Sequence, residues 1–322
     1  MMRSRIRPDL LQSRIPRSLS GAVCTALLLA MPTIAADVKQ TAASSQVDSP
    51  SFGYVVRTPA DGSLELRAIL GIPGAARFSD PIALPDGTFS AEPAPGQGWV
   101  LAIRSNEAVA FLPTRGATTS IARIGTPSAW AFSPSGSRLA LFYPDRGNVL
   151  LMSGLPANPK LESTVRVAQL DSFAISDNGI LAYSADHKIL NSGGGLIFNA
   201  AGPFTFEPGR DSLILFDGVN SNLLEVAAAG AATRVIAGGI TAPDQILAGT
   251  DAIFLGNTSA GTVSLVAYSD GSISTRSVSV SRFVSTSIAG TVLVSSDTDQ
   301  PTWLVNAQGV SFVPAIVTQS VQ

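Results

Sequence analysis

The sequence predicts an all-β fold: a seven-bladed β-propeller with four antiparallel strands in each blade. Three observations predict it. Short apolar segments recur at a spacing near 40 residues, and an Asp or Asn follows each of them. After the first 36 residues, no window of a dozen residues keeps a helical apolar pattern without Gly, Pro or Ser interrupting it. Several short strands in a repeat of about 40 residues are typical of a propeller blade.

The recurring apolar segment is interpreted as the second strand of each blade. Successive copies start 45, 39, 42, 33, 39 and 39 residues apart. The first and fourth spacings are irregular, so six or eight blades remain open as alternatives. The seven copies begin at Tyr54, Trp99, Arg138, Ile180, Leu213, Ala252 and Thr291.

Before most of these strands lies a segment that ends in a tight turn, and it is predicted to be the innermost strand of its blade. Six such segments begin at Thr88, Ser128, Asp171, Pro203, Pro243 and Ser281. A seventh inner strand must come from residues 38–47 or residues 314–322, and the second is the better β former. Pairing the two chain ends in one blade would remove an exposed sheet edge.

Two further segments are expected to form strands. The Ala-rich tract over residues 223–232 is predicted as a strand and a turn, with a short helix as the alternative. The alternating Ser/Val tract from Ser272 fits a strand with one solvated face, and low-complexity disorder is the alternative.

One blade carries a motif. Residues 130–140 read Trp-Ala-Phe-Ser-Pro-Ser-Gly-Ser-Arg-Leu-Ala, and residues 173–179 are a looser copy. The stretch resembles the TolB-like or WD-like β-propeller repeat, in which an aromatic strand enters a Ser-Pro-Asp-Gly turn before a Lys- or Arg-led apolar strand. Ser135 stands where that repeat has Asp. The resemblance implies propeller architecture over residues 51–322.

The first 36 residues have the layout of a secretory signal peptide. Five Arg precede an apolar run over residues 21–31, and small residues then offer a cleavage site before Asp37. We expect cleavage near Ala36 and a periplasmic or secreted protein, with an uncleaved N-terminal anchor as the alternative. Residues 37–50 are predicted to be a flexible segment, and residues 51–322 a single propeller domain.

Composition excludes several functions. Removal of residues 1–36 leaves 16 basic and 22 acidic residues, a formal charge of −6. The basic residues are scattered singly, whereas a phosphate-binding surface needs clustered Lys and Arg, so no nucleic-acid partner is expected. The only cysteine, Cys24, lies inside the signal, so the mature form has no disulfide or thiolate metal site.

The candidate binding residues lie in loops that a propeller places on one face, at the mouth of its channel. In this interpretation the Asp/Asn series after the second strands would form a ring there, as surface turn residues. The candidates are Arg104, Glu107, Asp145, Arg146, Asp186, His187, Asp217, Asn257 and Asp297.

No catalytic residue is predicted. His187 is the only histidine, so the usual zinc site cannot form, and no Gly-x-Ser-x-Gly elbow accompanies it. Residues 297–299 (Asp-Thr-Asp) open like a calcium loop, but the Gly and the closing Glu are absent. We therefore expect no metal site and no cofactor, with calcium left open because carboxylates supply its oxygen ligands.

These observations favour an exported, non-catalytic propeller that binds an envelope protein or polymer through one loop face. We expect a monomer with no transmembrane segment after the signal. The alternative is a divalent-metal-dependent hydrolase of the propeller lactonase type, so the enzyme question stays open. A purely structural domain is a third possibility.

Overall fold

The computed structural model describes residues 51–313, apart from residues 60, 73–74, 168, 200–201, 231–232, 279, 281, 287–289 and 296–301. Within this part, the strands form seven antiparallel sheets, six with four strands and one with three. Each sheet is one blade, numbered here along the chain. The predicted signal peptide, the segment 37–50 and Asp297 lie outside the described residues.

The strands of the first four blades follow one another in chain order. Blade 1 contains β1 (Ser51–Arg57), β2 (Glu65–Leu70) and β3 (Arg77–Phe78). Blade 2 contains β4 (Ser90–Pro93), β5 (Val100–Arg104), β6 (Glu107–Leu112) and β7 (Ala117–Ala122). Blade 3 contains β8 (Ala129–Phe132), β9 (Leu139–Tyr143), the 3-10 helix η1 (Pro144–Arg146), β10 (Asn148–Ser153) and β11 (Lys160–Arg166). Blade 4 contains β12 (Ser172–Ile175), β13 (Leu181–Ala185), β14 (Lys188–Asn191) and β15 (Leu196–Phe198).

The last three blades repeat the same order. Blade 5 contains β16 (Phe204–Phe206), β17 (Ser212–Asp217), β18 (Asn222–Ala227) and β19 (Thr233–Ala237). Blade 6 contains β20 (Gln245–Ala248), β21 (Ala252–Asn257), β22 (Thr262–Ala267) and β23 (Ile273–Ser277). Blade 7 contains β24 (Arg282–Ser285), β25 (Thr291–Ser295), β26 (Thr302–Asn306) and β27 (Gly309–Val313).

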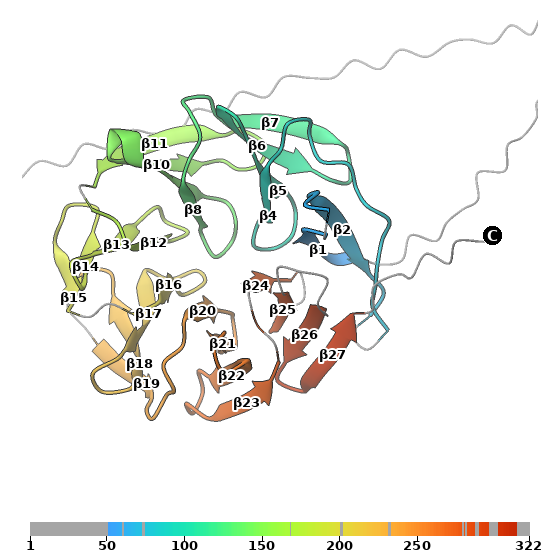
Figure 1. Cartoon of the computed structure of the whole chain (residues 1–322). Helices are drawn as coiled ribbons and strands as arrows, with labels where there is room; N and C mark the ends of the chain where they lie inside the picture. Colours follow the sequence, from blue (N-terminus) through green and yellow to red (C-terminus); the bar gives the residue numbers. More distant parts are fainter. Residues whose placement is uncertain are drawn as a thin grey trace, which may run out of the picture. The chain divides into compact units, whose positions relative to one another are not determined.

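The blades stand around a common centre, with the first strand of each four-stranded blade nearest to it (Figure 1). Blades 7 and 1 close the ring, because Phe52 and Val55 of β1 share a buried cluster with Leu293 of β25. This arrangement confirms the predicted seven-bladed propeller. All seven predicted second strands are present, as β1, β5, β9, β13, β17, β21 and β25.

The six predicted inner strands are also present, as β4, β8, β12, β16, β20 and β24. Blade 1 has three strands among the described residues. The burial of β1 resembles that of the other second strands rather than that of the inner ones. Both segments predicted to complete blade 1, residues 38–47 and 314–322, lie outside the described residues.

The two ambiguous segments are strands. Asn222–Ala227 is β18 and leads into a turn, which confirms a strand and turn in the Ala-rich tract. Ile273–Ser277 is β23, whose residues alternate between exposed and half-buried, as a strand with one solvated face requires. Among the described residues no helix is long and apolar enough to cross a membrane.

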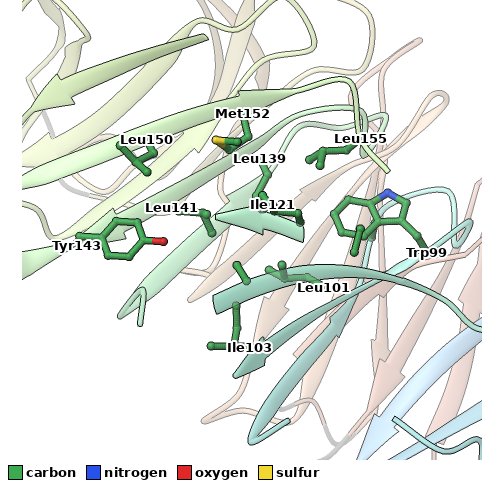
Figure 2. Packing of buried hydrophobic residues seen from close by; sticks show 13 residues of the cluster. Trp99, Leu101, Ile103, Ile121, Leu139, Leu141, Tyr143, Leu150, Met152 and Leu155 are labelled. Carbon is green, nitrogen blue, oxygen red and sulfur yellow. The ribbon is translucent and has the colours of Figure 1, made fainter. Parts of the chain in front are cut away.

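The hydrophobic core lies between blades rather than in one central mass. Second strands are buried on both faces, so they read as continuous apolar runs, as in Val100–Arg104. The cluster between blades 2 and 3 extends from Trp99 at one end to Tyr143 at the other (Figure 2). The Trp99 ring meets Phe132 of β8 edge to face, with ring centroids 5.4 Å apart.

All three tryptophans take part in this packing between blades. Trp99 is buried, and its Nε1 donates a hydrogen bond to Gly136 O of the next blade at 3.2 Å. Trp130 is half-buried against the same cluster, and its Nε1 donates to Glu92 Oε2 at 2.6 Å. Trp303 packs against the cluster between blades 6 and 7.

A carboxylate ties three consecutive blades together. Asp177, in the β12–β13 turn of blade 4, accepts hydrogen bonds at Oδ1 from the backbone N–H and the hydroxyl of Ser135 in blade 3, at 2.9 and 2.6 Å. Its Oδ2 accepts from Gly209 N of blade 5 at 3.2 Å. Partial burial raises the pKa of the Asp177 carboxyl, but these hydrogen bonds outweigh burial and hold the pKa below its usual range.

We expect this carboxylate to make stability depend on pH. A depressed pKa in the folded state means that the stabilisation is complete above the unfolded pKa and is lost as pH falls through the folded pKa. Asp177→Asn should lower the free energy of unfolding near neutral pH by about 1–2 kcal/mol. The difference from wild type should shrink between about pH 5 and pH 2.

Urea denaturation across this pH range measures the effect. Asp86→Asn, an exposed Asp on the connection between β3 and β4, is the matched control and should leave the curve unchanged. A pH-independent difference between wild type and Asp177→Asn would show that the charge of Asp177 does not stabilise the fold.

Candidate functional site

One face of the propeller, called the loop face here, collects the predicted site. Antiparallel strands reverse direction at each turn, so the turns between second and third strands lie on the same side as the connections from one blade to the next. Of the nine candidate residues, the eight that the structure describes all lie in such turns or at the strand ends that flank them. Asp297 lies outside the described residues.

Three Asp and Asn side chains of the series, those of Asp61, Asp217 and Asn257, accept hydrogen bonds within their own turns. Asp61 Oδ1 accepts a hydrogen bond from Ser63 N at 2.9 Å. Asn257 Oδ1 accepts from Ala260 N at 2.8 Å, while its Nδ2 donates to Ala242 O at 2.9 Å. A side chain that accepts a backbone N–H two or three residues ahead stabilises a turn locally.

Asp186 and His187 form a two-residue turn. They are the only two residues between β13 and β14, and their φ angles are 49° and 59°. Two left-handed residues in a two-residue hairpin define the turn geometry that favours Asn, Asp and Gly. Asp186, His187 and the adjacent Lys188 are all exposed. The turn therefore presents mixed charge to solvent from blade 4.

Asp217 differs from the expected surface turn residue. It is the last residue of β17 and only 5% exposed. Its Oδ1 accepts from Val219 N at 3.0 Å and its Oδ2 accepts from Asn220 Nδ2 at 2.6 Å. Because its carboxylate is buried and saturated within the turn, Asp217 is structural and does not point outward.

Blade 2 carries a charged network on the loop face. Glu107 Oε1 accepts a hydrogen bond from Arg123 Nε at 2.7 Å, and Glu107 Oε2 accepts from Arg104 Nη1 at 3.4 Å. The hydrogen bond from Arg123 holds the pKa of the Glu107 carboxyl below its usual range. The structure thus brings together two of the predicted residues, Arg104 and Glu107, and adds Arg123, which the sequence did not single out.

Blade 3 contributes the adjacent turn. Asp145 and Arg146 belong to η1 and are exposed, and Gly147 closes the turn with φ 57°. Arg146 Nη2 donates to Ile124 O, on the connection from blade 2, at 3.1 Å. Arg123 and Arg146 both line a cavity between blades 2 and 3. Four predicted residues, Arg104, Glu107, Asp145 and Arg146, therefore gather along one blade boundary.

Sequence reasoning missed the side chains beside this turn. Tyr143 and Asn148, the last residue of β9 and the first of β10, are paired across the hairpin and line the same cavity. Only their position next to the predicted turn could have indicated them. Among the described residues, Tyr143 Oη and Asn148 Oδ1 are buried without a hydrogen-bond partner.

Exposed apolar side chains accompany the charges. Phe89 is 55% exposed immediately before β4, and Val219 is 85% exposed in the β17–β18 turn. Ile124, on the connection between blades 2 and 3, is 37% exposed. Phe89 N donates to Ile103 O, which places Phe89 next to Arg104 at the end of β5. The loop face therefore mixes exposed apolar and charged groups.

The opposite face holds a second charged cluster, between blades 5 and 6. Glu207, Arg210, Glu225, Arg234 and Tyr268 line a polar cavity of about 430 Å³. Its charges are paired, Arg210 with Glu207 at 3.2 Å and Arg234 with Glu225 at 2.6 Å. Burial, reinforced by the two carboxylates, raises the pKa of the Tyr268 hydroxyl far above its usual range. Since its charges pair internally, this cluster serves the blade contact.

The described residues contain no group of three or more His, Cys, Asp or Glu side chains that could hold a metal ion. His187 in particular projects from an exposed two-residue turn. The site geometry thus gives no support to a hydrolase that positions a channel metal with converging carboxylates.

The seven sheets and the loop face define a seven-bladed β-propeller protein with a mixed polar and apolar face. No family model and no curated protein matches the sequence. Among solved structures, it is similar to virginiamycin B lyase from Staphylococcus aureus, with 11% identity, a TM-score of 0.46 and coverage of 83% of this chain and 94% of that chain.

Two other solved propellers are similar to the same degree. The RRP9 WD40 repeats share 11% identity with a TM-score of 0.48, over 72% of this chain and 82% of that chain. Hsv2 from Kluyveromyces lactis shares 8% identity with a TM-score of 0.49, over 67% and 73%. Similarity at this level does not assign a function to this chain. The propeller assignment rests on the sheets of the chain itself.

Turn residues of the site should differ in their effect on stability. Asp217→Ala removes the buried carboxylate that accepts from Val219 N and Asn220 Nδ2, and should reduce the free energy of unfolding by about 1–2 kcal/mol. Asp145→Ala and Asp186→Ala change exposed positions and should each cost under about 1 kcal/mol. Equilibrium denaturation of the three single variants measures this order, and equal losses would contradict the buried role of Asp217.

Proposed function

We propose that this protein is an exported, non-catalytic β-propeller that binds a protein or polymer of the cell envelope through its loop face. The observation that carries the proposal is the coincidence of exposed apolar side chains with charged groups on that face. Phe89 and Ile124 flank the Arg104–Glu107–Arg123 network. Binding surfaces combine apolar anchors with a polar surround in this way.

A rigid scaffold supports this role. Each loop is held by two strands of a sheet whose partner faces are buried, so the loops keep a fixed geometry without the partner. Arg123 and Arg104 are held by the single carboxylate of Glu107, which fixes the position of both guanidinium groups. Pre-organised side chains lose less entropy when a partner binds.

The signal layout of residues 1–36 supports export, and the resemblance of residues 130–140 to the TolB-like repeat agrees with an envelope role. Within the proposal the mature chain begins near Asp37, acts as a monomer and needs no cofactor. The metal-dependent hydrolase is the weaker candidate, because two of the loop-face acids are already engaged. Asp217 accepts hydrogen bonds within its own turn, and Glu107 pairs with Arg123.

Site-specific photocrosslinking in living cells tests the loop face. A photoreactive residue at Phe89 or Val219 should give a defined adduct with an envelope component. The same residue at Ile72, 63% exposed in the β2–β3 turn on the opposite face, is the matched control and should give none. Adducts from Ile72 alone, or from all three positions equally, would overturn the loop-face assignment.

Charge reversal at Arg104 tests whether the charged groups of the loop face contribute to partner binding. Arg104→Glu places two carboxylates together and removes a guanidinium from the face, so the adduct yield at Phe89 should fall by roughly tenfold. Arg115→Glu, in the β6–β7 turn on the opposite face, should leave the yield unchanged.

Cell fractionation and N-terminal sequencing of the mature protein test export and cleavage after Ala36 in the same cells.

A thermal-shift scan tests the absence of a metal. Purified residues 37–322, treated with a chelator, should show the same unfolding midpoint with and without Ca²⁺, Mg²⁺ or Mn²⁺. A ligand that binds only the native state must raise the midpoint as its concentration rises. A concentration-dependent rise of the unfolding midpoint with one of these ions would favour the metal-dependent hydrolase, which activity assays on lactones and esters would then test.

A further inference from the structure

The cavity between blades 2 and 3 has the character of a small-molecule site. Its volume is about 430 Å³, within the usual range for ligand pockets. Apolar side chains from three strands form one part of its lining: Ile121 and Ala122 of β7, Leu150 and Met152 of β10, and Leu161 of β11. Four of its lining residues, Ile121, Tyr143, Leu150 and Met152, also belong to the buried cluster between blades 2 and 3 (Figure 2).

Two buried polar atoms face this cavity. The β9–β10 register pairs Tyr143 with Asn148, so both side chains stand on the same side of the sheet. Tyr143 is 3% exposed, and within the described part of the chain neither its Oη nor Asn148 Oδ1 has a hydrogen-bond partner. An unpartnered buried polar atom destabilises the fold, so two in one cavity indicate groups that a ligand satisfies.

The two atoms offer a ligand one hydrogen-bond donor and one acceptor. A tyrosine hydroxyl donates to an anion or a carbonyl, and an amide oxygen accepts from a hydroxyl or an N–H. A phenylalanine at position 143 would fill the same volume without burying a hydroxyl. Burial raises the pKa of Tyr143, so its hydroxyl keeps its proton near neutral pH and remains a donor.

A positively charged side chain shares the lining of the cavity. Arg146 and Tyr143 both line it. Among the described residues Arg146 makes no ion pair, and its hydrogen bond goes to the neutral Ile124 O. Arg123, by contrast, is paired with Glu107. Arg146 and Tyr143 together therefore offer two donors to one anionic group.

We propose that this cavity binds a small carboxylic acid that has an apolar body and a hydroxyl close to the carboxylate. The carboxylate accepts from Arg146 and Tyr143, the hydroxyl donates to Asn148 Oδ1, and the apolar body lies along Leu150, Met152 and Ile121. This site goes beyond the proposed docking role of the loop face, because it rests on buried side chains of β9 and β10.

Isothermal titration of the mature protein, residues 37–322, with 3-hydroxydecanoate tests the proposal. Binding with a dissociation constant below about 1 mM is expected. Decanoate lacks the hydroxyl and 1-decanol lacks the carboxylate, so each should bind at least about tenfold more weakly. Equal binding of all three molecules would indicate a non-specific apolar surface and would overturn the site.

Single substitutions locate the ligand. Tyr143→Phe and Arg146→Gln should each weaken 3-hydroxydecanoate binding by roughly tenfold or more, since each removes a hydrogen bond to a charged group. Tyr268→Phe and Arg115→Gln are the matched controls. Tyr268 Oη is also buried without a partner among the described residues, but it lines the other cavity, and Arg115 lies in a turn of the opposite face.

The stability of the Tyr143→Phe variant completes the test. Without ligand it should be at least as stable as wild type, because the hydroxyl it removes has no partner. Loss of stability without any change in binding would show that the hydroxyl serves the fold through an ordered water, and would overturn the proposal. These outcomes are independent of crosslinking at Phe89, so each site can fail without the other.

Discussion

The burial of each second strand between neighbouring sheets is the constraint on which the propeller depends. One face of the strand Leu139–Tyr143 packs against blade 2, through Leu139 and Leu141, and its other face packs against blade 4, through Ala140. No blade can bury its apolar surface alone, so stability arises at the contacts between blades. The ring needs a contact between the first and last blades for the same reason, and Phe52 and Leu293 provide it.

This constraint does not fix the turn side chains, so the turns determine where the propeller can bind a partner. Most turn carboxylates are committed to local hydrogen bonds, as Asp217 is, or to the next blade, as Asp177 is. Charged and apolar groups that can meet a partner gather at the boundary of blades 2 and 3. Within the described part of the chain, Arg146 donates there to a neutral carbonyl oxygen, and the β9–β10 hairpin keeps a buried hydroxyl and a buried amide oxygen without a hydrogen-bond partner.

The architecture could be predicted from sequence because its signals are local. An apolar run before an Asp or Asn turn identifies a second strand wherever it occurs, and the spacing of these runs gives the blades. The missed features are non-local. Ser135 and Asp177 are 42 residues apart, and the sequence of neither turn predicts the hydrogen bond between them. Asp217 has the sequence context of an exposed turn residue, yet it is buried because β17 extends to include it.

The site was predicted in part for the same reason. The turn containing Asp145 and Arg146 could be found by its charge, while Tyr143 and Asn148 look like ordinary strand ends in the sequence. Their role depends on the cavity that β7 and β11 leave beside them, and the shape of a cavity depends on how two blades pack.

The shared carboxylate of Asp177 also bears on how the ring opens. In a repeat protein whose units contact only their neighbours, local opening can start at any unit and spread outward. One side chain that holds Ser135 and Gly209 at once couples blades 3, 4 and 5 into a single cooperative segment. Opening of blade 4 should therefore release the contacts to blades 3 and 5 together rather than one at a time.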